Sequence, residues 1–141
     1  MNLSENRPLA PLTSLQLGGA AKFFADLHTE QDLIDALDYA DEHGEKVFVL
    51  GEGSNTVVAD EGFAGLVLHP CLMGMRRSLN GDKVRVEVGA GEKWDTFAQG
   101  CVEEGLVGVE SLCGIPGQVG STPIQNVGAY GQEVADTIKS V

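Results

Sequence analysis

Cations, paired cysteines and long apolar runs are all scarce in this sequence. Its 141 residues contain 9 Lys and Arg against 21 Asp and Glu, so the net charge is −12. Nucleic acids and anionic membranes are bound through clustered cations, and this composition predicts neither as a partner. No apolar run approaches the roughly 20 residues of a membrane span, and residues 1–8 lack the apolar stretch of a signal peptide.

The cysteines are few and unpaired in pattern. Cys71, Cys101 and Cys113 form no C-x-x-C motif, and their number is odd, which argues against a disulfide framework. The three histidines, His28, His43 and His69, show no ligand spacing, so the sequence predicts no metal site. A reducing, cytoplasmic location is the expectation that fits this cysteine usage best.

Glycine is the residue in excess. There are 19 glycines in 141 residues, about twice the usual share of roughly 7%. They follow no fixed period, which excludes collagen-like and solenoid architectures. Hydrophobic residues make up 43% of the chain, enough for a packed core.

Strands and helices alternate over the first two thirds of the sequence. Because strands outnumber helices, the predicted fold class is α+β. The strands are expected over residues 22–27, 46–50, 56–59, 65–68 and 84–88, the helices over 29–43 and 92–104, an extended arm over 9–19 and irregular chain over 106–141.

The first helix carries the clearest local signals. Thr29 can cap its amino end, Asp32 can complete a capping box, and Gly44 suits the position after its carboxyl end. An apolar stripe is predicted on it from the spacing of Leu33, Ile34, Leu37 and Ala40. On the second helix Trp94 is predicted to belong to the core.

The first glycine cluster is Gly51-Glu52-Gly53-Ser54-Asn55, directly after an expected buried strand. Glycines there allow backbone N–H groups to converge on an anion. The dinucleotide fingerprint G-x-G-x-x-G fails, because Thr56 stands at the third glycine and β-branched residues follow. A phosphate-binding loop and a plain turn between strands both remain open at this point.

The second cluster spans residues 114–131 and is long and uncharged. No Lys or Arg occurs between Trp94 and Ile138, so backbone N–H groups or the hydroxyls of Ser121 and Thr122 would have to hold any phosphate. Gln125, Asn126 and Tyr130 could contact the polar edge of a heterocycle. The alternative is a glycine-rich structural loop packed on the core.

Taken together, the two clusters resemble the UDP-N-acetylenolpyruvoylglucosamine reductase (UDP-N-acetylmuramate dehydrogenase) family. Residues 50–55 and 115–131 resemble its two flavin loops, and residues 13–19 and 88–94 also resemble family segments. The resemblance implies a FAD-binding domain of the vanillyl-alcohol-oxidase (PCMH) type, in which two small α+β subdomains clasp FAD. We place these subdomains at residues 1–70 and 71–141, the second being incomplete.

The resemblance also implies a reaction. NADPH would reduce FAD, and the reduced flavin would reduce UDP-N-acetylglucosamine enolpyruvate to UDP-N-acetylmuramate, a precursor of peptidoglycan, with consequences for cell shape and division. The family's catalytic serine, arginine and glutamate lie in a later, substrate-binding domain, so none is assigned here. We therefore expect a piece of a longer protein, inactive by itself, which meets the UDP-sugar substrate through that missing domain.

The positions that the resemblance assigns to cofactor binding all lie in the two loops. The assigned residues are Gly51, Glu52, Gly53, Ser54, Asn55, Thr56, Ile115, Pro116, Gly117, Gly120, Ser121, Thr122, Ile124, Gln125, Asn126, Gly128, Ala129 and Tyr130.

Two alternatives to this function remain. One is an FAD-linked oxidase of the same superfamily, and the other is a non-catalytic module that binds nucleotides or anions.

Overall fold

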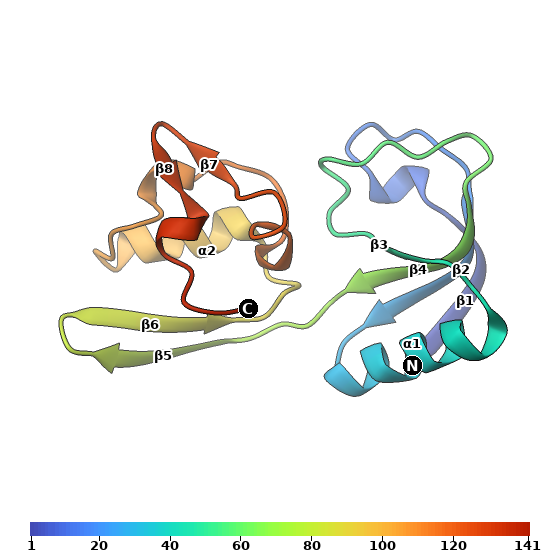
Figure 1. Cartoon of the computed structure of the whole chain (residues 1–141). Coiled ribbons are helices and arrows are strands. Elements are labelled where there is room, and N and C mark those ends of the chain that lie inside the picture. Colours follow the sequence, from blue (N-terminus) through green and yellow to red (C-terminus); the bar gives the residue numbers. More distant parts are fainter. The chain divides into compact units, whose positions relative to one another are not determined.

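The chain is described from Met1 to Val141 by a computed structural model. It forms two compact units, Met1–Leu72 and Met73–Val141, each with hydrophobic packing of its own (Figure 1). None of the helices combines the length and the apolar character that a membrane crossing requires. The two units are taken in turn below.

The first unit is a four-stranded sheet with one helix on it. Strand β1 runs antiparallel to β2, whereas β2 and β3 both run parallel to β4. The carboxyl ends of three parallel strands therefore meet at one edge, which is where open α/β sheets bind ligands. In the order β1-β2-β4-β3, the strands are β1 (Asn2–Pro8), β2 (Ala20–Leu27), β4 (Phe63–Pro70) and β3 (Val47–Val49).

Helix α1 (Glu30–His43) begins and ends where its local signals predict. The Thr29 hydroxyl accepts a hydrogen bond from the Asp32 amide, and the Asp32 carboxylate accepts one from the Thr29 amide. Gly44 adopts a φ of 66° immediately after the helix. The predicted capping box and terminal glycine are confirmed.

The buried face of α1 differs from the predicted stripe. Ala36 and Ala40 are the residues packed against the sheet, with Leu33 beside them. Ile34 and Leu37, which the stripe included, are 50% and 45% exposed. Small residues allow the helix backbone to approach the sheet closely, and this turns the larger side chains outward.

Alternating residues of β2 and β4 supply the two faces of the sheet. Ala25 and Leu66 lie toward α1, whereas Phe24 and Val67 lie on the opposite face. That opposite face is covered by the 3-10 helix η1 (Ala10–Leu12) and by the chain that follows β3 (Figure 1).

The second unit has little regular structure. It contains a hairpin of β5 (Met75–Asn80) and β6 (Lys83–Val88), and one helix, α2 (Trp94–Glu103). The remainder consists of short pieces, most of which contribute residues to the core around Trp94. These are the 3-10 helices η2 (Glu110–Leu112), η3 (Val119–Ser121) and η4 (Val134–Asp136) and the paired strands β7 (Gly128–Ala129) and β8 (Gln132–Glu133).

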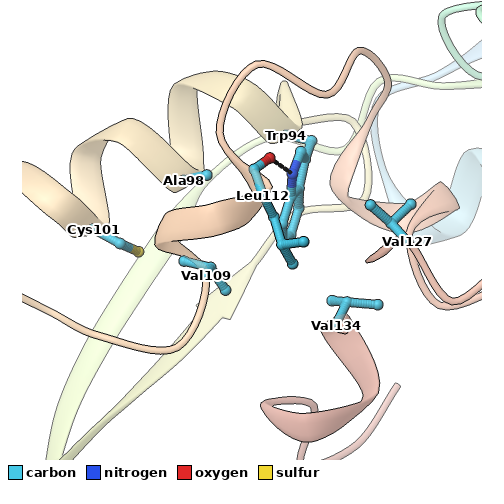
Figure 2. Packing of buried hydrophobic residues seen from close by; sticks show 7 residues of the cluster. All are labelled: Trp94, Ala98, Cys101, Val109, Leu112, Val127 and Val134. Carbon is cyan, nitrogen blue, oxygen red and sulfur yellow. Dashed lines mark hydrogen bonds between the residues drawn. The ribbon is translucent and has the colours of Figure 1, made fainter. Parts of the chain in front are cut away.

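Trp94 is central to the core of this unit, as predicted (Figure 2). It is 2% exposed, and its indole Nε1 donates a hydrogen bond of 2.9 Å to the carbonyl of Leu112. Val127 and Val134 belong to the same cluster. The long irregular segment is therefore held in place by hydrophobic contacts with the Trp94 region.

Two expectations about regular structure are wrong. Strands β1 and β5 were not expected, because their sequences are polar and their side chains are largely exposed. Residues 56–59 form no strand, although two of them are valines.

Candidate functional site

The first glycine loop begins where β3 ends, at the carboxyl edge of the first unit's sheet. Leu50 is fully buried, and its amide donates to the carbonyl of Leu68 at 2.9 Å. Beyond it, the amide N–H groups of Gly51, Gly53 and Ser54 have no acceptor within the chain. Unpaired N–H groups close together in a turn are the donors that an anionic group needs.

Gly53 has a structural reason to be glycine. Its φ is 65°, and a Cβ there would lie 2.7 Å from the Cα of Thr13 and still closer to the carbonyl oxygen of Leu12. The carbonyl of Gly53 also accepts a hydrogen bond from the Ser14 amide at 3.2 Å. The loop is thus shaped by close contact with residues 12–14.

The remaining side chains of this loop lie at different depths. Asn55 is exposed, while Glu52, Ser54 and Thr56 are half-buried. Asn55 and Glu52 each already interact within the chain. Ser54 and Thr56 are therefore the side chains of the loop with accessible, uncommitted hydrogen-bonding capacity.

The first half of the second loop is anchored to the chain that precedes α2. The Gly120 amide donates to Ala90 at 3.0 Å, the Val119 amide donates to Glu92 at 2.8 Å, and Gly117 accepts from Trp94 at 2.9 Å. A Cβ on Gly120 would lie 2.7 Å from that of Ala90. The glycine at this position is explained by backbone packing.

The two hydroxyl residues of the loop support its turn. Ser121 Oγ donates to the carbonyl of Gln118 at 2.7 Å, and Thr122 Oγ1 donates to that of Val119 at 2.8 Å. Thr122 is 3% exposed, whereas Ser121 borders solvent. In the structure as described, only Ser121 could meet a ligand without rearrangement.

The second half of the loop carries most of its exposed surface. Ile124 and Tyr130 are 82% and 96% exposed, and Gln125 and Gly128 are also open to solvent. Tyr130 has a φ of 53°, a backbone conformation that residues other than glycine rarely adopt. Such strain persists where the surroundings over-determine it, and it is frequent at ligand contacts.

Asn126 holds this half of the loop in shape. Its Nδ2 donates to Glu133 at 2.7 Å, its Oδ1 accepts from the Ala135 amide at 3.2 Å, and its φ is 46°. A shallow depression of about 360 Å³ lies beside it. Asn126 and Glu133 border this depression together with Gly128, Ala129, Gly131 and Gln132.

The remaining assigned residues are at the beginning of the loop. Ile115 is half-buried and packs on the core of the second unit, whereas Pro116 is exposed. Gly117 is buried with a φ of 130°. Hydrogen bonds from its own backbone amide and from that of Gly108 hold the pKa of Glu110 below its usual range, with the Gln132 side chain contributing.

A third group of polar side chains was missed at the sequence level. At the carboxyl ends of β2 and β4, Asp26 Oδ1 lies 2.7 Å from His69 Nδ1, and Cys71 Sγ lies 3.4 Å from the same nitrogen. Asp26 lies far from His69 and Cys71 in the sequence, and the three meet only because Asp26 pairs with His69 across parallel strands. The one available signal was the His69-x-Cys71 spacing at the end of a strand, which puts two ligand types on one face.

Comparison with known proteins gives a consistent result. The family described as FAD binding domain matches residues 21–141. The UDP-N-acetylenolpyruvoylglucosamine reductase of Thermobifida fusca is 49% identical over 141 residues, which are 99% of this chain and 40% of that protein. The reductase of the same name from Streptomyces avermitilis is 48% identical over 134 residues, 95% of this chain and 36% of that protein.

A solved structure agrees in fold. The crystal structure of UDP-N-acetylenolpyruvylglucosamine reductase from Thermus caldophilus superimposes with a TM-score of 0.76 and 31% identity. The match covers 96% of this chain and 46% of that one. The chain thus spans less than half the length of the relatives that it matches.

Proposed function

Because the chain belongs to the FAD binding domain family, we propose that it is the flavin-binding part of a UDP-N-acetylenolpyruvoylglucosamine reductase. The observation that carries this proposal is the first glycine loop. Three amide N–H groups without acceptors follow a buried residue at the carboxyl edge of parallel strands. This donor set fits a pyrophosphate, which otherwise would need cations that this acidic chain has in short supply.

The two loops are suited to different parts of the cofactor. In the first, the amides of Gly51, Gly53 and Ser54 would receive the pyrophosphate oxygens. In the second, the uncharged surface of Ile124, Gln125 and Tyr130 would meet the flavin ring, whose potential a fixed charge would shift. Asn126, Gly120 and Thr122 would keep the second loop in shape, given the hydrogen bonds and contacts that they already make.

The chemistry that FAD supplies when bound is hydride transfer, from NADPH to the enolpyruvyl group of UDP-N-acetylglucosamine enolpyruvate, which gives UDP-N-acetylmuramate. We assign no catalytic residue to this chain. Its residues bind and orient the cofactor. Proton donation and recognition of the UDP-sugar belong to the larger part of the protein, so this chain by itself should not oxidise NADPH in the presence of that substrate.

The assignment of the first loop is tested by FAD titration of the purified chain, followed by quenching of flavin fluorescence. Ser54→Glu places a negative charge among the phosphate donors and should weaken FAD binding at least about tenfold, which corresponds to about 1.4 kcal/mol. The matched control is Ser78→Glu, with the same change on the exposed strand β5.

Two outcomes would contradict the proposal. Equal FAD affinity of Ser54→Glu and the unmodified chain would show that the loop does not face the pyrophosphate. Equal weakening by Ser78→Glu would show that net charge, and not this loop, determines binding. Binding of inorganic pyrophosphate by a chain that does not bind FAD would favour the alternative of a plain anion-binding module.

A further inference from the structure

Three potential metal ligands converge at the carboxyl edge of the first unit's sheet. Asp26, His69 and Cys71 each offer one ligand atom, and these atoms all lie within 4.8 Å of one another. Asp26 and His69 are paired residues on neighbouring parallel strands, so the backbone of the sheet fixes their separation. Cys71 follows directly after β4, and its amide is anchored to the carbonyl of Leu27 at 2.8 Å.

The geometry does not suit a proton relay. In a nucleophile–histidine–carboxylate relay the imidazole uses one nitrogen for the carboxylate and the other for the nucleophile. Here Asp26 Oδ1 and Cys71 Sγ both approach His69 Nδ1.

The same distances do suit a tetrahedral ion. Zinc bonds of about 2.0–2.3 Å to nitrogen, oxygen and sulfur place neighbouring ligand atoms about 3.4–3.6 Å apart. The pair Cys71 Sγ and His69 Nδ1 is 3.4 Å apart, and Cys71 Sγ is 3.8 Å from Asp26 Oδ1. Only the 2.7 Å between Asp26 and His69, a hydrogen bond, would have to open, and the Asp26 side chain is 47% exposed.

The charge balance points the same way. Asp26 has no Lys or Arg partner, and its one ion pair is with His69. A carboxylate, an imidazole nitrogen and a thiol are thus gathered without a fixed cation, in a chain of net charge −12. The His69 side chain is 23% exposed, so an ion could enter from solvent and keep a position open for water.

We propose that Asp26, His69 and Cys71 form a binding site for a divalent transition-metal ion of the zinc type, with three protein ligands and an open fourth position. On binding, the Cys71 thiol loses its proton to solvent and its sulfur bonds to the metal. His69 coordinates through Nδ1 and keeps its proton on Nε2, and Asp26 contributes one carboxylate oxygen. This proposal does not depend on the proposal that the chain binds flavin.

The test uses the purified, reduced chain after removal of metal with a chelator, titrated with Co²⁺ and then with Zn²⁺. One equivalent of Co²⁺ should give a near-ultraviolet thiolate-to-cobalt charge-transfer band, which Zn²⁺ then removes. Cys71→Ser should abolish the band. His69→Gln and Asp26→Asn should each weaken Co²⁺ binding, at least about 100-fold for His69→Gln, because loss of even an outer-shell partner costs about 10–100-fold.

Matched controls change the same residue types elsewhere. Cys113→Ser and His28→Gln should leave the band and the Co²⁺ affinity unchanged, and circular dichroism checks that every variant is folded. The proposal is overturned if the unmodified chain gives no charge-transfer band, if the band persists in Cys71→Ser, or if Cys113→Ser removes it. If Cys71→Ser does not fold, unchanged Co²⁺ affinity in both His69→Gln and Asp26→Asn overturns it equally.

Discussion

Shortening one core side chain of the second unit, Leu112→Ala, should strongly destabilise that unit. Leu112 is fully buried, and its carbonyl accepts the indole hydrogen bond of Trp94. Substitutions of this kind cost about 2–5 kcal/mol, depending on how far the site collapses, and we expect about 3 kcal/mol here. Ordinary domains have only about 5–15 kcal/mol of stability, so this loss is a large share.

The assay is urea unfolding followed by tryptophan fluorescence. Trp94 is the only tryptophan of the chain, so its emission reports on the second unit specifically. Leu79→Ala is the matched control, because Leu79 is 86% exposed on β5 of the same unit and should change stability by no more than about 0.5 kcal/mol. Leu112→Met, which nearly conserves volume, should cost less than about 1.5 kcal/mol.

The reasoning has a clear point of failure. If Leu112→Ala loses less than about 1 kcal/mol, or no more than Leu79→Ala, the packing in Figure 2 does not hold the unit together. Val127 and Val134 share the cluster with Leu112. The second loop should therefore loosen in Leu112→Ala, and the affinity for FAD should fall in that variant and not in Leu79→Ala.

Two further predictions concern the first unit. Gly62→Ala should destabilise the chain far more than Gly44→Ala in thermal unfolding. Both glycines have positive φ, but only at Gly62 would a Cβ collide with the backbone of Ala20. Equal losses of stability in the two variants would refute this. Asp32 has its pKa lowered to about 2 by hydrogen bonds from the amino terminus and Thr29. The stabilising contribution of its charged form is complete above the ordinary pKa of 3.8 and is lost as the pH falls toward 2. In urea unfolding, Asp32→Asn should therefore be less stable than the unmodified chain near neutral pH and should match it near pH 2. A difference in stability that does not change with pH would contradict the assignment.

Local chemistry was predictable where a few neighbouring residues decide the structure. The capping box of Thr29 and Asp32 and the glycine at position 44 required only residues close in sequence. Strands β1 and β5 were missed for the opposite reason: their polar residues pair through backbone hydrogen bonds with a partner strand, and no hydrophobic periodicity marks them.

The candidate site divides along the same line. The two glycine loops are continuous segments, so the sequence could indicate them. It could not show that Gly53 and Gly120 are required by close contacts with neighbouring chain, or that Thr122 is buried. The group of Asp26, His69 and Cys71 exists only because β2 and β4 pair in parallel. That pairing is a tertiary fact, and no spacing in the sequence encodes it.

The strand order of the first unit also has a consequence for synthesis on the ribosome. Strand β4 lies between β2 and β3 in the sheet, yet it is the last of the four to be made. Until Pro70 has emerged, β2 and β3 each present an unpaired edge, and Leu66 and Val67 are not there to close the two faces of the core. The nascent chain can form the β1–β2 ribbon and α1 early, but the sheet closes in one late step, when its central strand arrives.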